Sequence, residues 1–188
     1  YNQALQYMDA CLELLNPQQM EWVVLSLRKA NLYTMAYAQT LDEEYFKKAL
    51  ALMEEIVKIM PQNYTAMNNL AYLLADNNQE LDKALEYARK ACQNELGNPV
   101  FLDTYAYIQC LLGNYEDAQQ SLHRAIQLHE AQNEPIPWEV HKHLGMAQEG
   151  LKKTPEAVAS YQRAIESADI PAKEKEALDQ KIRDLIQL

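Results

Sequence analysis

The stretch Asn68-Asn69-Leu70-Ala71-Tyr72-Leu73-Leu74-Ala75 decides the fold, because its central Ala-Tyr pair returns along the chain. The same dipeptide stands 35 residues earlier, at Ala36-Tyr37, and 35 residues later, at Ala106-Tyr107. The positions around each Ala-Tyr pair repeat as well. A further alanine follows each pair, at Ala49, Ala84 and Ala118. Self-similarity at this period predicts an array of stacked supersecondary units, whose usual function is to offer an extended binding surface.

The segments that follow the repeated alanines have helical periodicity. Ala49, Met53, Ile56 and Val57 fall at spacings of three and four residues, and the segments from Ala84, Ala118 and Ala157 behave alike. Such spacing places one apolar stripe on each helix. We therefore predict helix pairs at 20–40 and 42–60, 63–76 and 80–95, 99–112 and 114–130, and 137–151 and 154–168.

Prolines and caps fall between these helices. Asn98-Pro99 is typical of an N-cap followed by a proline in the first turn, and Thr154-Pro155 is expected to open a helix in the same way. The divisions expected are a trailing helix of a truncated repeat (1–17), four repeats (18–62, 63–98, 99–135 and 136–170) and a capping helix (171–188). The first repeat has an extended first helix. On this interpretation the chain is part of a longer protein.

Composition limits the classes of partner. The chain has 188 residues, of which 48% are hydrophobic, and a formal charge of −10. Because nucleic-acid and anionic membrane binding rely on Lys and Arg, this charge argues against both partners and favours a neutral to basic protein segment. The longest apolar stretch is too short to span a membrane.

Cysteine and histidine spacing predicts no metal site or other cofactor. Cys11, Cys92 and Cys110 form no metal or redox motif, and Cys92 and Cys110 are expected to be small buried thiols. His141 and His143 are two residues apart on a helix and so point to different faces. His123 and His129 are expected to stand alone.

These residues resemble the tetratricopeptide repeat (TPR) family over nearly the whole chain, in a bacterial style. The matching columns include Tyr105, Ala106, Gly113, Tyr115 and Ala118, and again Leu144, Gly145, Ala157, Tyr161 and Ala164. The resemblance implies an all-α, right-handed solenoid of antiparallel helix pairs, a TPR superhelix, whose concave face is lined by first helices. It also implies protein or peptide binding without catalysis. The amphipathic pattern of residues 171–188 predicts a C-terminal capping helix that covers the open end of the stack.

By the same resemblance, three tyrosines occupy the first-helix column that faces the groove: Tyr37, Tyr72 and Tyr107. They would form a ladder of phenols suited to recognition, or would only line the wall by packing. Met146 takes this place in the fourth repeat. Nearby polar groups could bond a peptide backbone, or could be ordinary helix faces: Asn68, Asn69, Asp103, Thr104, Lys142 and His143. Trp138 is expected to pack the fourth helix pair against the preceding repeat. Trp22 is also expected to have a packing role.

Two functions from different classes follow. The first is a protein-interaction module that binds a partner segment on the concave face. The second is a structural scaffold that self-associates as a homo-oligomer, since residues 1–17 leave an open face. A third, weaker hypothesis is glycan binding by the tyrosine ladder, as in an envelope or export system. The residues leave open a cytoplasmic or a periplasmic location.

Overall fold

A computed structural model describes residues 1–187, apart from the side chain of Asn2, and Leu188, the last residue of the predicted capping segment, lies outside them. Every regular element in these residues is an α-helix: α1 (Asn2–Leu12), α2 (Met20–Thr40), α3 (Glu43–Ile59), α4 (Tyr64–Asp76), α5 (Leu81–Asn94), α6 (Pro99–Leu111), α7 (Tyr115–Ala131), α8 (Trp138–Gly150), α9 (Thr154–Glu166) and α10 (Ala172–Ile186). These bounds confirm the all-α prediction and the predicted helix pairs to within two residues, whereas the trailing helix expected over 1–17 ends at Leu12.

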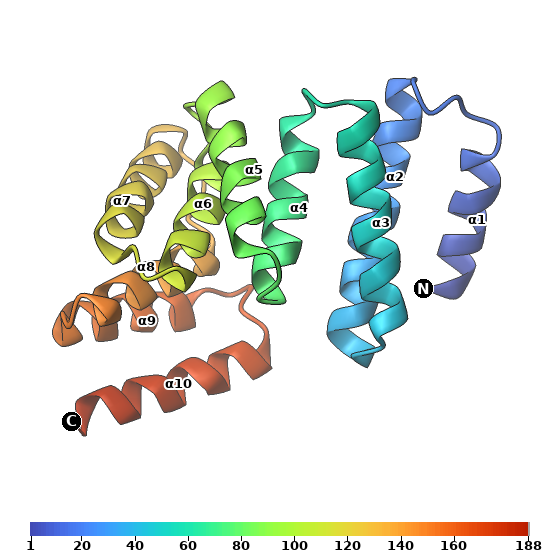
Figure 1. Ribbon diagram of the computed structural model, residues 1–188. Coiled ribbons are helices and arrows are strands. Elements are labelled where there is room, and N and C mark those ends of the chain that lie inside the picture. The colour runs from blue at the N-terminus through green and yellow to red at the C-terminus, as the bar shows by residue number, and fades with distance from the viewer. Residues whose placement is uncertain (188) are drawn as a thin grey trace. The chain divides into compact units, whose positions relative to one another are not determined.

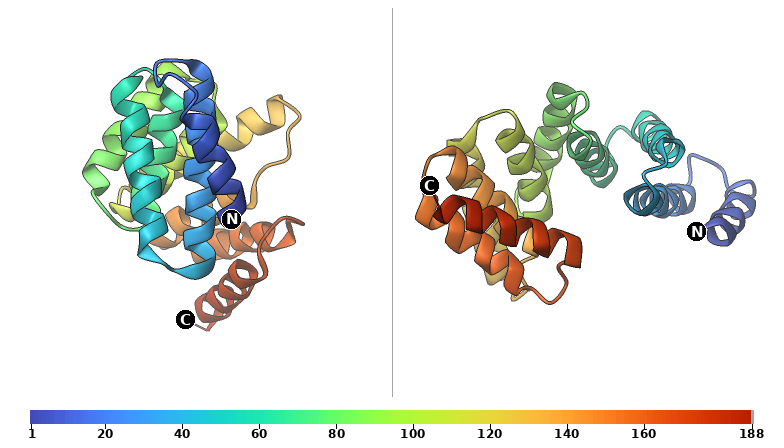
Figure 2. Two further views of the ribbon diagram at one scale, coloured as in Figure 1. Left: turned by 90° about the vertical axis from the view of Figure 1, so that its right-hand side faces the viewer. Right: turned by 90° about the horizontal axis from the view of Figure 1, so that it is seen from below.

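The chain forms two compact units, Tyr1–Ala91 and Cys92–Leu188, with the boundary inside α5. In the first unit, α2 packs against α1 and α3, and α3 packs against α4 (Figures 1 and 2). Alanines allow the close approach: Ala30, Ala36 and Ala49 are completely buried. Phe46 and Met53 of α3 are buried as well, and burying such a side chain contributes about 1.5–3 kcal/mol.

In the second unit, α6 packs against α7 and α8, α8 packs against α7 and α9, and α10 lies along α9 (Figure 1). The apolar stripe of α10 consists of Leu178, Ile182 and Leu185, which join Tyr161 and the small residues of α9 in one buried cluster. The predicted amphipathic last helix therefore packs its apolar side on α9.

Gly145 lets α8 and α9 approach closely. A methyl group added at Gly145 would come within 2.5 Å of the Tyr161 ring, which is 1% exposed. The Tyr161 hydroxyl donates a hydrogen bond to Glu149 of α8 at 2.9 Å. The buried ring and its hydroxyl group are therefore both held in place. The glycine is needed here for space, not for its backbone conformation.

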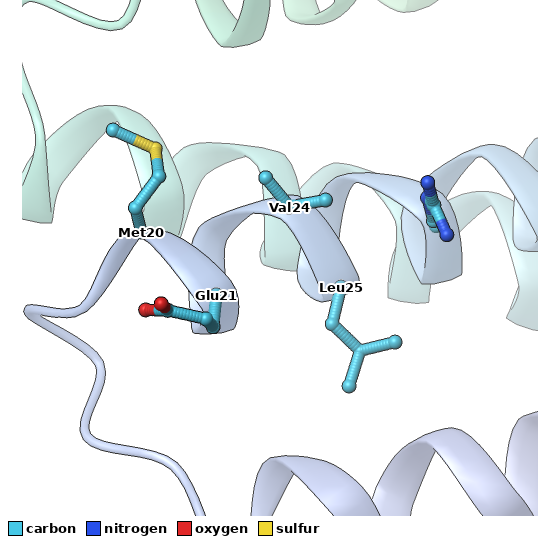
Figure 3. Close-up of a pocket in the computed structure, with 5 residues that line it drawn as sticks. Met20, Glu21, Val24 and Leu25 are labelled. Carbon is cyan, nitrogen blue, oxygen red and sulfur yellow. The ribbon is translucent and has the colours of Figure 1, made fainter.

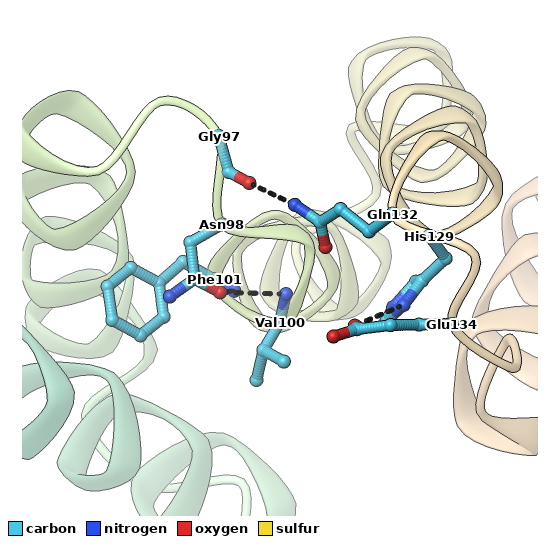
Figure 4. A network of polar contacts seen from close by, with 7 residues as sticks. All are labelled: Gly97, Asn98, Val100, Phe101, His129, Gln132 and Glu134. Carbon is cyan, nitrogen blue, oxygen red and sulfur yellow. Dashed lines mark hydrogen bonds and ion pairs between the residues drawn. The ribbon is translucent and has the colours of Figure 1, made fainter.

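Helix α6 begins as predicted. The side chain of Asn98 accepts hydrogen bonds from the backbone N–H groups of Val100 (3.1 Å) and Phe101 (3.4 Å), and Pro99 lies in the first turn (Figure 4). The expectation for Thr154 was wrong by one position, because Lys153 is the N-cap residue and Thr154 is the first residue of α9. Pro155 still fits, since the first turn needs no N–H from that residue.

Two expectations for single side chains are corrected. His129 does not stand alone: its ring is 3% exposed and its Nδ1 lies 3.6 Å from a carboxylate oxygen of Glu134 (Figure 4). Trp138 packs against the cluster formed by α9 and α10, whereas the sequence suggested the preceding repeat. Trp22 is buried, as expected.

Candidate partner-binding surface

The ten predicted binding residues divide between the two units. Tyr37, Asn68, Asn69 and Tyr72 lie on α2 and α4 of the first unit, and the other six lie on α6 and α8 of the second. Six of the ten are half-buried, which leaves part of each side chain open to a partner: Tyr37, Asn69, Tyr72, Tyr107, Lys142 and Met146. The remaining four are buried: Asn68, Asp103, Thr104 and His143. Buried side chains offer a partner little surface, so direct contact falls to the half-buried set.

Helices α6 and α8 bring the polar residues of the second unit together. Nδ1 of His143 lies 2.8 Å from Oδ1 of Asp103, and the two side chains are 3% and 13% exposed. Burying either group alone would cost free energy, so each satisfies the other. The sequence placed both residues near the groove but gave no sign that they pair.

Tyr107 lies directly on this pair. Its ring stacks on the His143 imidazole, with 4.4 Å between centroids and 15° between planes. One face of the phenol is thereby used inside the chain, while the side chain stays half-buried. A partner can reach only the remaining part of Tyr107.

Glu139 completes the group, and sequence reasoning missed it. Burial raises the pKa of the Glu139 carboxyl and the Asp103 charge raises it further, although His143 and Lys142 partly oppose the shift. Glu139 is half-buried and makes no ion pair or hydrogen bond to another side chain of the described residues. Its place one turn before His143 on α8 is the signal that could have found it. We call Asp103, Tyr107, Glu139 and His143 the α6–α8 face.

Lys142 does not serve as a free cation beside this face. Its ammonium group lies 2.7 Å from a Glu174 carboxylate oxygen on α10 and 5.4 Å from the centre of the Trp138 ring. A second ion pair, Lys181 to Glu149 at 2.6 Å, also joins α10 to α8. The positive charge predicted for the groove is therefore largely used to hold the last helix.

In the first unit, Tyr37 and Tyr72 have both aromatic and polar neighbours. The Tyr37 ring lies 5.5 Å from the Phe46 ring, and its hydroxyl donates a hydrogen bond to Glu43 at 3.5 Å. Asn68 is 3% exposed, and its buried Oδ1 has no hydrogen-bond partner in the structure. Tyr72 follows Asn68 by one helical turn, so both belong to one side of α4.

An apolar surface occurs at the start of α2. Met20 and Val24 are 59% and 43% exposed, and with Leu25 they border an open pocket between Glu21 and Arg28 (Figure 3). Tyr7 and Leu14, from α1 and the segment after it, are also exposed.

None of the helices in residues 1–187 is both long and apolar enough to cross a membrane. In the same residues, no three His, Cys, Asp or Glu side chains are grouped to hold a metal ion.

Comparison with known families identifies the class. The family model for the tetratricopeptide repeat matches residues 41–99 and 112–171, which is more than half of the chain. The chain therefore belongs to the tetratricopeptide repeat family. Members of this family are generally non-catalytic repeat modules that serve as interaction or scaffold domains.

Solved structures agree on the fold. The chain is similar to MamA of strain AMB-1 (15% identity, 96% of this chain and 97% of that chain covered, TM-score 0.58). It is also similar to TTC0263, a thermophilic TPR protein of Thermus thermophilus (18%, 87% and 100%, 0.52), and to the OM64 TPR domain of Arabidopsis (16%, 64% and 94%, 0.53). At these identities the likeness shows the α-solenoid fold alone. No curated protein sequence matches the chain.

Proposed function

We propose that the chain is a non-catalytic protein-interaction module that binds a segment of a partner protein on its first helices. In the second unit the segment lies on the α6–α8 face, and a basic side chain of the partner is recognised there. The observation that carries the proposal is the half-buried Glu139 carboxylate, which lacks a side-chain partner although it lies near the Asp103–His143 pair.

The chemistry of the face favours a cation. Glu139 supplies carboxylate oxygens, the nearby Asp103 adds negative charge, and Tyr107 supplies part of an aromatic ring, which attracts a positive charge. Lys142, the nearest competing ammonium group, is engaged by Glu174. Partial burial of Glu139 strengthens an ion pair formed there, because less water screens it.

A displayed library of random peptides, selected against the intact chain, tests this proposal. We expect the enriched sequences to share a Lys or Arg, and their affinity to fall about tenfold in Glu139→Gln, as for loss of one charge-assisted hydrogen bond. The exposed Glu116 of α7 gives the matched control Glu116→Gln, which should bind like the parent. Enrichment of neutral or acidic peptides whose affinity is unchanged by Glu139→Gln would overturn the proposed site.

A second candidate, self-association, is favoured by the exposed apolar surface of α1 and α2. Met20, Val24, Leu14 and Tyr7 lie exposed within one unit, and buried apolar area is the main driving force of association. Light scattering against concentration should show a rising mass that Met20→Glu with Val24→Glu abolishes. A constant monomer mass at high concentration removes this candidate.

Glycan binding by the tyrosines remains a prediction. The half-buried Tyr37, Tyr72 and Tyr107 rings would supply the aromatic surface on which a sugar stacks. Competition of partner binding by an oligosaccharide would be its test.

A further inference from the structure

A cleft of about 410 Å³ opens in the second unit between α7 and α9, with α8 as its floor. Its volume falls in the range of sites that take small ligands or single side chains, about 300–1,000 Å³. Leu144 and Gln148 come from α8, His123 from α7, and Ser160, Glu156 and Arg163 from α9. We call this space the α7–α9 cleft.

The cleft is distinct from the α6–α8 face. Gln148 follows Glu139 by nine residues, which is about 180° around a helix of 3.6 residues per turn. The two surfaces therefore use opposite sides of α8, and a partner could occupy both at once.

The floor carries an unused hydrogen-bond donor. Gln148 is 6% exposed, and its Oε1 accepts a hydrogen bond from Ser160 Oγ at 2.7 Å. The amide nitrogen of Gln148 makes no hydrogen bond among the described residues and is not one of their enclosed, unsatisfied polar atoms, so it is open to a ligand in the cleft. A ligand that brings an acceptor to the floor can take a hydrogen bond from this nitrogen.

Arg163 of α9 adds a positive charge at one end of the cleft. Arg163 and His123 are exposed, and neither makes an ion pair in residues 1–187. Glu156 precedes Arg163 by seven residues on α9, so their Cα atoms lie about 10 Å apart along the helix. The cleft is thus polarised, with an acid at one end and donors at the other.

We infer that the α7–α9 cleft binds an Asp or Glu side chain carried by an extended segment of a partner protein. The carboxylate accepts hydrogen bonds from the Gln148 amide and the Arg163 guanidinium, a planar group that suits a carboxylate. Glu156 repels a second acidic residue at the far end, which sets the direction of the segment. The inference does not depend on the proposed α6–α8 site, and either can fail alone.

Two blocked peptides test the inference: acetyl-Gly-Ser-Glu-Ser-Gly-amide and its Gln counterpart. Titrated into the isotope-labelled full chain, the Glu peptide should move the side-chain NH₂ signals of Gln148 saturably by NMR. We expect the Gln peptide to bind at least about tenfold more weakly, as for loss of a charged acceptor. Arg163→Gln should weaken the Glu peptide similarly, whereas Arg89→Gln, which removes an exposed charge from α5, should not.

Three results would overturn the inference. One is the absence of saturable shifts at Gln148. Another is equal affinity for the two peptides, which would exclude recognition of the carboxylate. The third is an equal effect of Arg163→Gln and Arg89→Gln, which would show that net charge alone attracts the peptide.

Discussion

The imidazole of His143 lies 2.8 Å from the carboxylate of Asp103, and this contact joins α8 to α6 across 40 positions of sequence. Both side chains are nearly removed from water, so each depends on the other for its hydrogen bond. Tyr107 stacks on the same imidazole, which makes the pair a support for the proposed binding face.

Removal of either partner should destabilise the chain. Asp103→Ala and His143→Ala are each expected to lower the free energy of unfolding by about 1–3 kcal/mol, because the remaining polar group stays buried without a partner. The double variant should lose clearly less than the sum of the two. Urea unfolding measures all three, with exposed Asp117→Ala as a control within about 0.5 kcal/mol of the parent. Strict additivity would show that the pair does not act as a unit.

Gly145→Ala should destabilise the chain, although alanine is the better helix former. The added methyl would meet the fixed Tyr161 ring at 2.5 Å, and such overpacking costs about 1–3 kcal/mol. Gly97→Ala is the matched control, since no atom lies within 4 Å of the new methyl. Thermal unfolding should lower Tm for the first variant and leave it nearly unchanged for the second. Equal Tm values would contradict the packing described for α8 and α9.

Glu139 should make stability fall as pH rises. Its folded pKa is raised, chiefly by burial, so the folded chain holds this proton more tightly than the unfolded chain does. The associated stabilisation is complete below the unfolded pKa, about 4.3, and is lost as pH rises through the folded pKa. Glu139→Gln should therefore gain stability relative to the parent between pH 4 and pH 7 in urea titrations. A difference that stays constant over this interval would refute the assignment.

Thiol reactivity should differ sharply among the three free cysteines. Burial raises the pKa of Cys92 and of Cys110 to about 12, whereas Cys11 is exposed. Because the thiolate is the reactive form, alkylation at pH 8 should label Cys11 first. Mass spectrometry after partial labelling checks the order. Early labelling of Cys110 would mean that α6 opens readily.

Local sequence signals were enough for the helices. The apolar spacing of Ala49, Met53 and Ile56 predicted α3, and Asn98-Pro99 marked the start of α6. These signals act within one or two helical turns, where backbone hydrogen bonding and capping decide the structure. The N-cap predicted at Thr154 was wrong by one position, because Lys153 is the N-cap residue of α9.

The side-chain partnerships were harder to predict. Asp103 and His143 lie on different repeats, and their pairing depends on how α6 and α8 stack. An alignment of the repeats on Ala106 and Gly145 places Thr104 and His143 at equivalent positions, with Asp103 one residue before. Such an alignment does not give the distance between Asp103 and His143. Lys142 was assigned to the groove because nothing in the sequence showed that Glu174 of α10 would reach it.

The central claim, that partners bind on the first helices, is tested most directly by affinity capture from the native lysate. The parent chain is compared with a triple variant, Tyr37→Ala with Tyr72→Ala and Tyr107→Ala, and with a control that alters Tyr1 and Tyr87 to Ala, all checked by circular dichroism. The account predicts that the first variant stays helical and loses the specific partners, while the control keeps them. Retention of the same partners by the helical first variant would contradict it.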